Sequence, residues 1–273
     1  MSDDNNIKKI WDVQVEILDK IVEICNRHEL RYYLIYGTLL GAVRHKGFIP
    51  WDDDLDIIMP RKDYEVFIEA ALEELPSEYF LQNDNTEDGY WLNFSKVRKN
   101  NTLFIEASEK IMGDNIHKGI FVDIFPLDCT KKPDGFVQHV EAVLIKAISE
   151  TRYLKKGILT ESSMKYNKVD KILKLFSHRI LSKWYVRLTK HKEEQCENYV
   201  DWFTNRSYTD SIYPKSWFGD GIKMKFMDKE YIVPEEYDLL LTKEYGDYMT
   251  LPKEEDRVMH RTTEVIFDIE EGR

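Results

Sequence analysis

Acidic residues lead straight into an apolar strand in the segment Pro50-Trp51-Asp52-Asp53-Asp54-Leu55-Asp56. Alternate residues of a strand share one face, so Asp54 and Asp56 point the same way, and Asp52 joins them if the strand begins that early. Carboxylates this close repel one another, so either their pKa values rise or a cation neutralises them. Because oxygen ligands suit a hard ion, the spacing predicts a Mg²⁺ site, with Mn²⁺ as the alternative.

Two other interpretations of the acidic segment were weighed. A solvated acidic turn before a strand has the same composition, and an isolated acidic triplet is more often such a turn. An EF-hand loop would use Asp52, Asp54 and Asp56 as its first three ligands. That loop needs glycine at its sixth position, where Ile57 stands, and glutamate at its twelfth, where Asp63 stands, so the EF-hand is rejected.

A glycine-bordered turn precedes the acidic segment, in the run Gly37-Thr38-Leu39-Leu40-Gly41-Ala42-Val43-Arg44. We expect Thr38 to cap a short helix that extends to Arg44. Glycine lets the backbone approach a phosphate, the helix N-terminus supplies N–H groups, and Arg44 adds a two-pronged cationic contact. A glycine-threonine pair alone is a weak signal, but its position just before an Asp-x-Asp strand predicts a phosphate cradle beside a metal site.

A third carboxylate interrupts the apolar run Ile120-Phe121-Val122-Asp123-Ile124-Phe125. A single acid in such a strand is costly to bury unless it is paired or bound to metal. One interpretation is an acid at the edge of a strand paired with a lysine. Given the other two motifs, we favour Asp123 as a third metal ligand or a general base.

The elements that must position these residues follow from the apolar periodicity. We predict helices over 7–25, 38–44, 63–75 and 234–245, strands over 32–36, 55–59, 91–97, 103–105 and 120–125, and a hairpin with strands 224–227 and 231–233. The stretch 136–203 contains no proline and is predicted to be mostly helical. The expected fold class is α+β, a mixed sheet with flanking helices, divided into a catalytic core (1–135), a helical part (136–210) and a C-terminal part (211–273) that packs back on the core.

Composition excludes several classes of protein. The 273 residues carry a net charge of −11, so a nucleic-acid phosphate backbone would be repelled. Cys25, Cys129 and Cys196 show no C-x-x-C spacing, which predicts buried reduced thiols rather than a disulfide or a zinc site. The N-terminus has no apolar signal region, and no apolar run approaches the roughly 20 residues that span a bilayer. We therefore expect a cytoplasmic protein.

One segment reverses the overall charge. Residues 165–192 contain nine Lys and Arg residues and one acid, so this segment carries about eight positive charges and the rest of the chain about nineteen negative ones. Its apolar residues are spaced as one helical stripe: Ile172, Leu173, Phe176, Ile180, Trp184 and Leu188. Such a helix either lies peripherally on an anionic membrane or packs its stripe on the core and leaves a solvated basic face, and the second interpretation is the commoner one.

Taken together, these motifs resemble the LicD family of the nucleotidyltransferase superfamily, which includes the fukutin-related group. The resemblance covers most of the stretch 32–252 and is weakest in the helical middle. Its most specific segments are Pro-Trp-Asp-Asp-Asp and Asp-Ile-Phe-Pro-Leu-Asp. The matching positions are 37–44, 50–56, 96–98, 119–128 and 245–249.

The resemblance implies a nucleotidyltransferase-like sheet and transfer of phosphocholine, or a related phospho-alcohol such as phosphoribitol, from a CDP-linked donor to a cell-surface glycan or its lipid-linked precursor. Asp52, Asp54, Asp56 and Asp123 would then bind Mg²⁺. Lys96 and Arg98 would lie near the departing CMP, although both could instead be surface cations. Two alternatives are an enzyme that adenylylates a small molecule and a non-catalytic metal-binding module.

Overall fold

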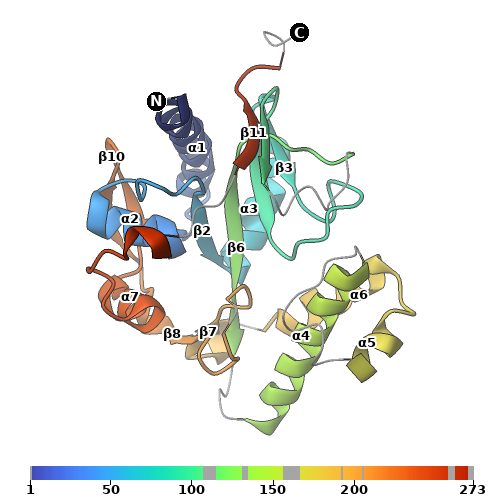
Figure 1. Ribbon diagram of the computed structural model, residues 1–273. Helices are drawn as coiled ribbons and strands as arrows, with labels where there is room; N and C mark the ends of the chain where they lie inside the picture. The colour runs from blue at the N-terminus through green and yellow to red at the C-terminus, as the bar shows by residue number, and fades with distance from the viewer. Residues whose placement is uncertain are drawn as a thin grey trace.

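A mixed β-sheet forms the centre of the molecule. The computed structural model of the chain describes residues 2–106, 115–130, 135–155, 167–191, 193–204, 206–257 and 262–269 (Figure 1). The strands run in the order β1-β2-β6-β4-β3, and β7 and β8 extend the sheet beyond the far end of β6. β2 and β6 are parallel, whereas the other neighbouring pairs are antiparallel. The expected α+β class, with helices flanking a mixed sheet, is confirmed.

β6 is the long central strand, and its ten residues are all buried. It continues through Pro126 to Thr130, whereas the predicted strand ends at Phe125. The N–H of Asp123 donates to Leu55 O at 2.9 Å, so by alternation the ring nitrogen of Pro126 faces away from β2. The pairing with β4 stops at Ile124, so the missing N–H costs no ladder bond on that side. The strands of this sheet are β1 (Tyr33–Leu34), β2 (Asp56–Pro60), β3 (Tyr79–Gln82), β4 (Ser95–Lys99), β6 (Phe121–Thr130), β7 (Asn198–Val200) and β8 (Ile212–Pro214).

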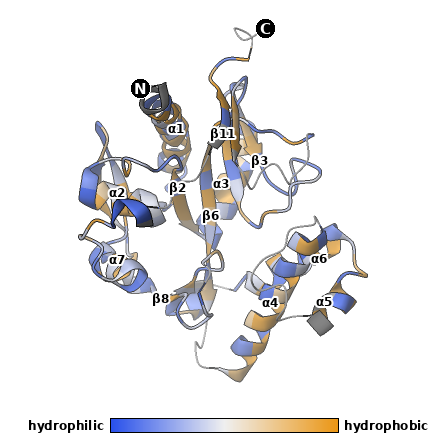
Figure 2. Cartoon of the chain, viewed as in Figure 1, coloured by the Kyte–Doolittle hydropathy of each residue, from blue (hydrophilic) through white to orange (hydrophobic). Residues whose placement is uncertain are grey.

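Two helices, α1 (Ser2–Arg27) and α3 (Arg61–Glu74), pack on one face of the sheet (Figure 1). Ile17, Leu18 and Ile21 of α1 are fully buried, as the apolar spacing of this segment predicted. α3 begins directly after Pro60 and buries Phe67 against the sheet. These contacts make the large core that holds the strands in register. Figure 2 shows the apolar residues concentrated in the central strands.

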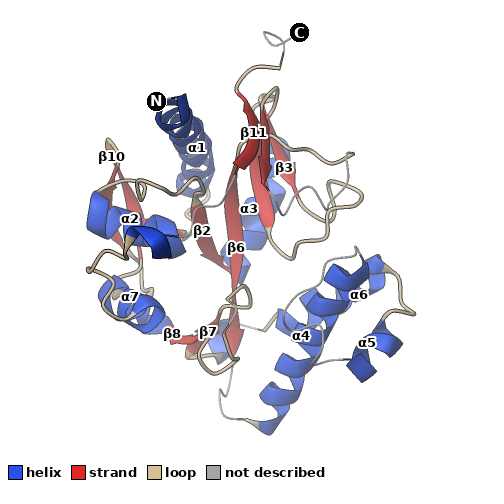
Figure 3. Cartoon of the chain, viewed as in Figure 1, coloured by secondary structure: helices blue, strands red, loops and turns tan. Residues whose placement is uncertain are grey.

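The helical part consists of α4 (Phe136–Lys155), α5 (Asn167–Leu173) and α6 (His178–Thr189), with its own small core (Figure 3). The basic segment is therefore not one continuous helix. A break precedes α6, where the Ser177 side chain accepts a bond from the Ile180 N–H as an N-cap. β7 also lies inside the stretch predicted to be helical, because Asn198–Val200 extends the sheet from β6. Lys165 and Lys192 lie outside the described residues.

The C-terminal part contains the predicted hairpin, β9 (Ile222–Phe226) and β10 (Lys229–Val233), and the predicted helix, α7 (Tyr237–Tyr245). Gly246 ends α7 with φ +68°, a conformation that favours glycine. A further strand, β11 (Thr262–Ile266), pairs with β5 (Leu103–Glu106) and was not predicted. Short 3₁₀ turns occupy Glu193–Gln195, Lys215–Trp217 and Glu254–Asp256. The division into three parts stays a prediction.

The cysteine prediction is wrong for two of the three thiols. Cys129 on β6 and Cys196, just before β7, form a disulfide with their Cα atoms 5.9 Å apart. Cys25 is a buried free thiol, as expected. Sequence spacing could not reveal the pair, because the antiparallel pairing of β6 with β7 brings together positions 67 residues apart. Across the described ranges, no helix combines the length and apolar character needed to cross a bilayer.

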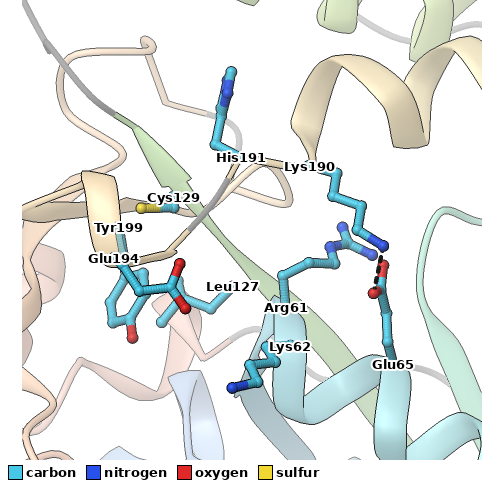
Figure 4. Close-up of a pocket in the computed structure, with 9 residues that line it drawn as sticks. All are labelled: Arg61, Lys62, Glu65, Leu127, Cys129, Lys190, His191, Glu194 and Tyr199. Carbon is cyan, nitrogen blue, oxygen red and sulfur yellow. Dashed lines mark hydrogen bonds and ion pairs between the residues drawn. The ribbon is translucent and has the colours of Figure 1, made fainter.

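A largely buried ion pair joins α3 to β6. The Arg61 guanidinium donates two bonds to Asp128, at 2.7 and 2.8 Å, and the Asp128 side chain has no exposed surface. Arg61 borders a cavity of about 360 Å³ at the end of β6, where Lys190 also pairs with Glu65 at 2.6 Å (Figure 4). A buried charge that loses its partner is strongly destabilising.

We expect Arg61→Met to lower the free energy of unfolding by about 3 to 5 kcal/mol at neutral pH, because the Asp128 carboxylate is left buried and unpaired. The double variant Arg61→Met/Asp128→Leu should recover most of this loss. Urea denaturation measures both, and Lys20→Met, which breaks the more exposed Lys20–Glu23 pair, serves as a control that should cost under about 1 kcal/mol. A single variant as stable as that control would contradict the prediction.

Candidate active site

Asp56 and Asp123 are direct neighbours on the parallel strands β2 and β6. Because residues in register on adjacent strands point to the same face, the third carboxylate lies beside the Asp-x-Asp pair. Asp54 and Asp52 are close enough to raise the pKa of Asp56 by charge repulsion. The structure therefore brings the four predicted acidic residues into one neighbourhood.

The pKa values of these carboxylates are raised, first of all by burial. The pKa of Asp56 lies well above its ordinary value because burial is reinforced by repulsion from Asp54, Asp123 and Asp52. Burial also raises the pKa of Asp123 to about 6, although Lys96 and Arg98 oppose the shift. The pKa of Asp52 is raised to about 6 by burial and repulsion from Asp53, against the effect of a hydrogen bond to Asp54. A site of this kind stabilises an added positive charge.

Lys96 is the nearest cation to this cluster. It lies opposite Asp123 on β4, its Nζ is 2.8 Å from Asp123 Oδ1, and its side chain is only 3% exposed. Its ammonium also lies over the Phe121 ring. The interpretation of Lys96 as a surface cation is therefore wrong, because the register of β4 with β6 places its side chain in a buried position beside Asp123.

Arg98 also proves to be buried rather than on the surface. Its guanidinium donates to Gly119 O at 2.7 Å and to the Gln82 side chain, and it stacks on Phe121. With no exposed surface, this side chain holds β3, β4 and the entry to β6 together. Its influence on the site is electrostatic, since it lowers the pKa of Asp123.

The carboxylate set fits a divalent cation in charge and in donor type, because hard cations prefer oxygen ligands. Burial raises the pKa values of Asp52, Asp56 and Asp123, and repulsion from the neighbouring carboxylates adds to this shift at Asp56. Within the described ranges, however, no three His, Cys, Asp or Glu side chains converge in the arrangement of a metal site. The ion pair with Lys96 keeps Asp123 in its present position.

The helix α2 (Tyr36–His45) positions the acidic segment through its first turn. Thr38 Oγ1 accepts a bond from the Asp56 N–H at 2.9 Å, so this buried hydroxyl anchors β2. The expectation that Thr38 caps the helix is wrong, because α2 begins two residues earlier with Ile35 as its N-cap. A Cβ on Gly37 would lie 2.6 Å from Asp52 Oδ2, so glycine is needed for that carboxylate to approach the turn.

A cavity of about 730 Å³ opens above α2 and the acidic segment. Three of the four acids line it, namely Asp52, Asp54 and Asp56, whereas Asp123, the neighbour of Asp56 on β6, is not among the lining residues. Gly37 and Arg44 also line it, as predicted. The remaining lining residues are Tyr36, Leu40, Ile49, Trp51, Tyr245, Asp247, Tyr248, Thr250, Leu251, Pro252 and Arg257.

Two arginines line this cavity. Arg44 donates from Nη1 to Tyr248 O at 3.0 Å, which joins α2 to the segment after α7. The Arg257 guanidinium lies 4.3 Å from the centre of the Trp51 ring. The cavity therefore combines an acidic floor with cationic and aromatic walls, a composition suited to a ligand that carries phosphate and a metal ion.

Several of these residues carry no functional signal in the sequence. Tyr36 has φ +50°, which is rare for a residue with a side chain, and its hydroxyl donates to the buried Asp201. Tyr245, Asp247 and Tyr248, which line the cavity, belong to the segment 245–249. The family resemblance includes this segment but assigns it no function. Asp201 gave no signal, because it follows β7, a strand that was not predicted.

The family is decided by comparison with known proteins. The model of the LicD/FKTN/FKRP nucleotidyltransferase domain matches residues 29–148, which include every predicted site residue. The "Lipopolysaccharide cholinephosphotransferase LicD" of Haemophilus influenzae is 31% identical over 270 residues, which cover 92% of this chain and 94% of that protein. The chain belongs to the LicD family.

Two further similarities cover only a short part of the chain. An uncharacterized protein of Rickettsia prowazekii is 46% identical over 50 residues, 18% of either chain. An uncharacterized protein of Rickettsia typhi is 51% identical over 41 residues, 15% of this chain and 13% of that protein. Both matches are confined to a short part of this LicD-family chain, whereas the Haemophilus protein aligns along almost the whole length.

Asp201 provides a test of the electrostatics around the cavity. Burial raises its pKa to about 6 from 3.8, although bonds from Tyr36 and the Phe203 N–H oppose the shift. The folded state therefore binds a proton at Asp201 more tightly than the unfolded state does. This stabilises the fold fully at pH values below the pKa of Asp201 in the unfolded chain, and the stabilisation is lost as the pH rises through about 6.

We expect Asp201→Asn, which stays neutral, to reduce the loss of stability between pH 4 and pH 8 by about 2 to 3 kcal/mol. Urea denaturation at the two pH values measures this, with Asp220→Asn at an exposed position as the control. If the free energy of unfolding changes with pH equally in wild type and Asp201→Asn, the raised pKa of Asp201 is contradicted.

Proposed function

We propose that this LicD-family protein transfers phosphocholine, or a related phospho-alcohol, from a CDP-linked donor to a hydroxyl of a cell-surface glycan or its lipid-linked precursor, and releases CMP. The observation that carries the proposal is the buried Asp56–Asp123 pair beside a cavity of about 730 Å³, in a chain similar along its length to a lipopolysaccharide cholinephosphotransferase. The nucleotidyltransferase-like character of the sheet belongs to the same proposal.

The donor pyrophosphate would lie over the start of α2. Gly37 borders the cavity at that turn, the helix N-terminus favours negative charge, and Arg44, also in the cavity lining, can neutralise phosphate. Arg257 supplies a second cation in the cavity lining. The alcohol of the donor would then meet Trp51 or Tyr245, whose aromatic faces suit a quaternary ammonium group.

Asp54 and Asp56 would hold Mg²⁺ from the floor of the cavity, with Asp52 and Asp123 as further oxygen donors. Mn²⁺ would be the alternative ion. When bound, the cation supplies stabilisation for the negative charge that builds up on the transferred phosphoryl group. The mutual repulsion that raises the pKa of Asp56 supports this assignment, because a bound cation would remove it.

Asp123 would accept the proton of the attacking acceptor hydroxyl at its carboxylate. With a pKa of about 6, this group is mostly ionised at neutral pH and remains basic enough to take a proton. Lys96 acts as a positioning residue, since its ammonium fixes Asp123 Oδ1 and stabilises the ionised form. Positioning and electrostatics would provide most of the rate acceleration, as in other phosphoryl transfers.

We expect the purified chain with Mg²⁺ and CDP-choline to release CMP when an acceptor glycan is present, and Asp54→Asn or Asp56→Asn to lower that rate by at least about a thousandfold. Both variants should fold at least as stably as wild type, because each removes a carboxylate from a repelling cluster. Nucleotide chromatography measures CMP, and Asp220→Asn is the matched control.

Release of pyrophosphate from a nucleoside triphosphate would favour the adenylylating alternative. Full activity in Asp54→Asn or Asp56→Asn would remove the carboxylates from the reaction. No turnover with any CDP-alcohol would favour the non-catalytic metal-binding module.

The transferred alcohol can be identified by binding. We expect one of CDP-choline, CDP-ethanolamine, CDP-ribitol and CDP-glycerol, with Mg²⁺, to raise the melting temperature more than the others, because a ligand that binds only the native state stabilises it. A ligand at about 100 times its Kd contributes about 2.7 kcal/mol. Differential scanning fluorimetry measures the shift. Equal shifts for all four compounds and for CMP would show that the alcohol is not recognised.

A further inference from the structure

The helices α5 and α6 present a surface that combines exposed apolar and basic side chains. Leu175 between them is 82% exposed and Ile172 is 62% exposed. Ile180, Trp184 and Val186 of α6 are also among the exposed large apolar residues. Figure 2 shows hydrophilic and hydrophobic residues interleaved on α6. We call the set Ile172, Leu175, Ile180, Trp184 and Val186, with the exposed cations among them, the α5–α6 surface.

The apolar residues of this surface exceed what the helical core uses. The small core buries Leu173 of α5 and Leu181 and Tyr185 of α6. On α6, Leu181 and Tyr185 lie on a different face of the helix from Ile180 and Trp184. The expected apolar stripe is thus divided, with Leu173 buried but Ile172, Ile180 and Trp184 exposed in the described structure. A solvated basic face over a buried stripe does not account for this arrangement. Several large apolar residues exposed on neighbouring elements indicate a binding surface.

Most cations of the surface are exposed and have no acidic partner among the described residues. No acidic residue occurs between Lys171 and His191 in the sequence. Of the six exposed cations, Arg179 pairs with Asp88 at 3.3 Å and Lys190 with Glu65 at 2.6 Å. The other four make no ion pair with any residue that the structure describes: Lys171, Lys174, Lys183 and Arg187.

We propose that the α5–α6 surface docks on an anionic lipid bilayer. Aliphatic side chains such as Leu175 and Ile172 gain free energy when they enter the acyl region, while neighbouring lysines remain at the headgroups. A nucleic acid would use the cations but would leave these aliphatic groups in water. The rest of the chain carries about nineteen negative charges and is repelled by the same membrane, so the charge distribution selects this side of the molecule for contact.

The surface leads toward the candidate active site. Lys183 and Arg187 also line a cleft of about 650 Å³ between α6 and the core. Phe94 lines the same cleft and stands two residues before Lys96, the partner of Asp123. A lipid-linked acceptor held at the bilayer would therefore have a path along this cleft, a consequence that rests on the proposed transfer reaction. Membrane binding itself does not depend on that reaction.

The test is flotation of the full chain with vesicles of phosphatidylcholine, with and without added phosphatidylglycerol, at low and high salt. We expect binding to the anionic vesicles, at least tenfold weaker to the neutral ones, and loss of binding at high salt. Lys171→Gln/Lys174→Gln should lower the partition coefficient by roughly 25-fold, since each lysine near an anionic surface contributes about fivefold. Ile172→Ser/Leu175→Ser should lower it by about tenfold.

The matched control is Ile222→Ser/Lys223→Gln/Lys225→Gln on β9, where an exposed apolar residue and two exposed lysines occur on another element. This variant should bind like wild type. The proposal is overturned if the chain binds neither kind of vesicle, if binding ignores lipid charge, or if the control weakens binding as much as the α5–α6 variants. Saturable capture of these helices by an acidic protein, without vesicle binding, would assign the surface to a protein partner instead. Because flotation does not measure turnover, its outcome is independent of the CMP assay.

Discussion

The parallel register of β2 and β6 places two carboxylates side by side in a buried position, and the surrounding structure compensates for that placement. Asp56 and Asp123 are held there by the backbone ladder, whatever the charge of their side chains. The repulsion between them, added to burial, raises the pKa of Asp56. Lys96 reaches Asp123 from β4 because the antiparallel register sets the two residues opposite each other. A site held in this way responds strongly to added positive charge.

The cavity beside these carboxylates is assembled from segments far apart in the chain. The first turn of α2 anchors β2 through Thr38 and accommodates Asp52 through the absence of a side chain at Gly37. The segment after α7 forms the opposite wall, tied to α2 by the bond from Arg44 to the Tyr248 carbonyl. Folding of the C-terminal part is therefore required for a complete cavity, even though the acidic residues occur in the first half of the chain.

The helical part has a different balance of forces from the core. Its small apolar cluster buries few side chains, and one tie to the core is the pair between Lys190 of α6 and Glu65 of α3. Exposed pairs of this kind contribute little stability. The exposed Leu175 and Ile172 are costly in water, so their presence is better explained by a role in binding than by one in folding.

Local sequence patterns determined much of this protein. The apolar periodicity of α1, the alternation of Asp54 and Asp56, the hairpin before α7 and the lone acid in β6 all follow from side-chain type and spacing. These features depend on neighbours within a few residues, so the sequence alone predicts them. The same patterns gave the family, because its most specific motifs lie in the segments that form the site.

Only the tertiary structure decided which of these segments meet. Nothing local shows that β11 pairs with β5, that Cys129 joins Cys196, or that Lys96 is buried against Asp123. The short strands β7 and β8 form because β6 offers them an edge, and Asp201 joins the site only through them. The division of the basic segment into exposed and buried apolar residues likewise depends on how α4, α5 and α6 pack. Long-range register sets these contacts, because strand pairing and helix packing select among arrangements that are locally equivalent.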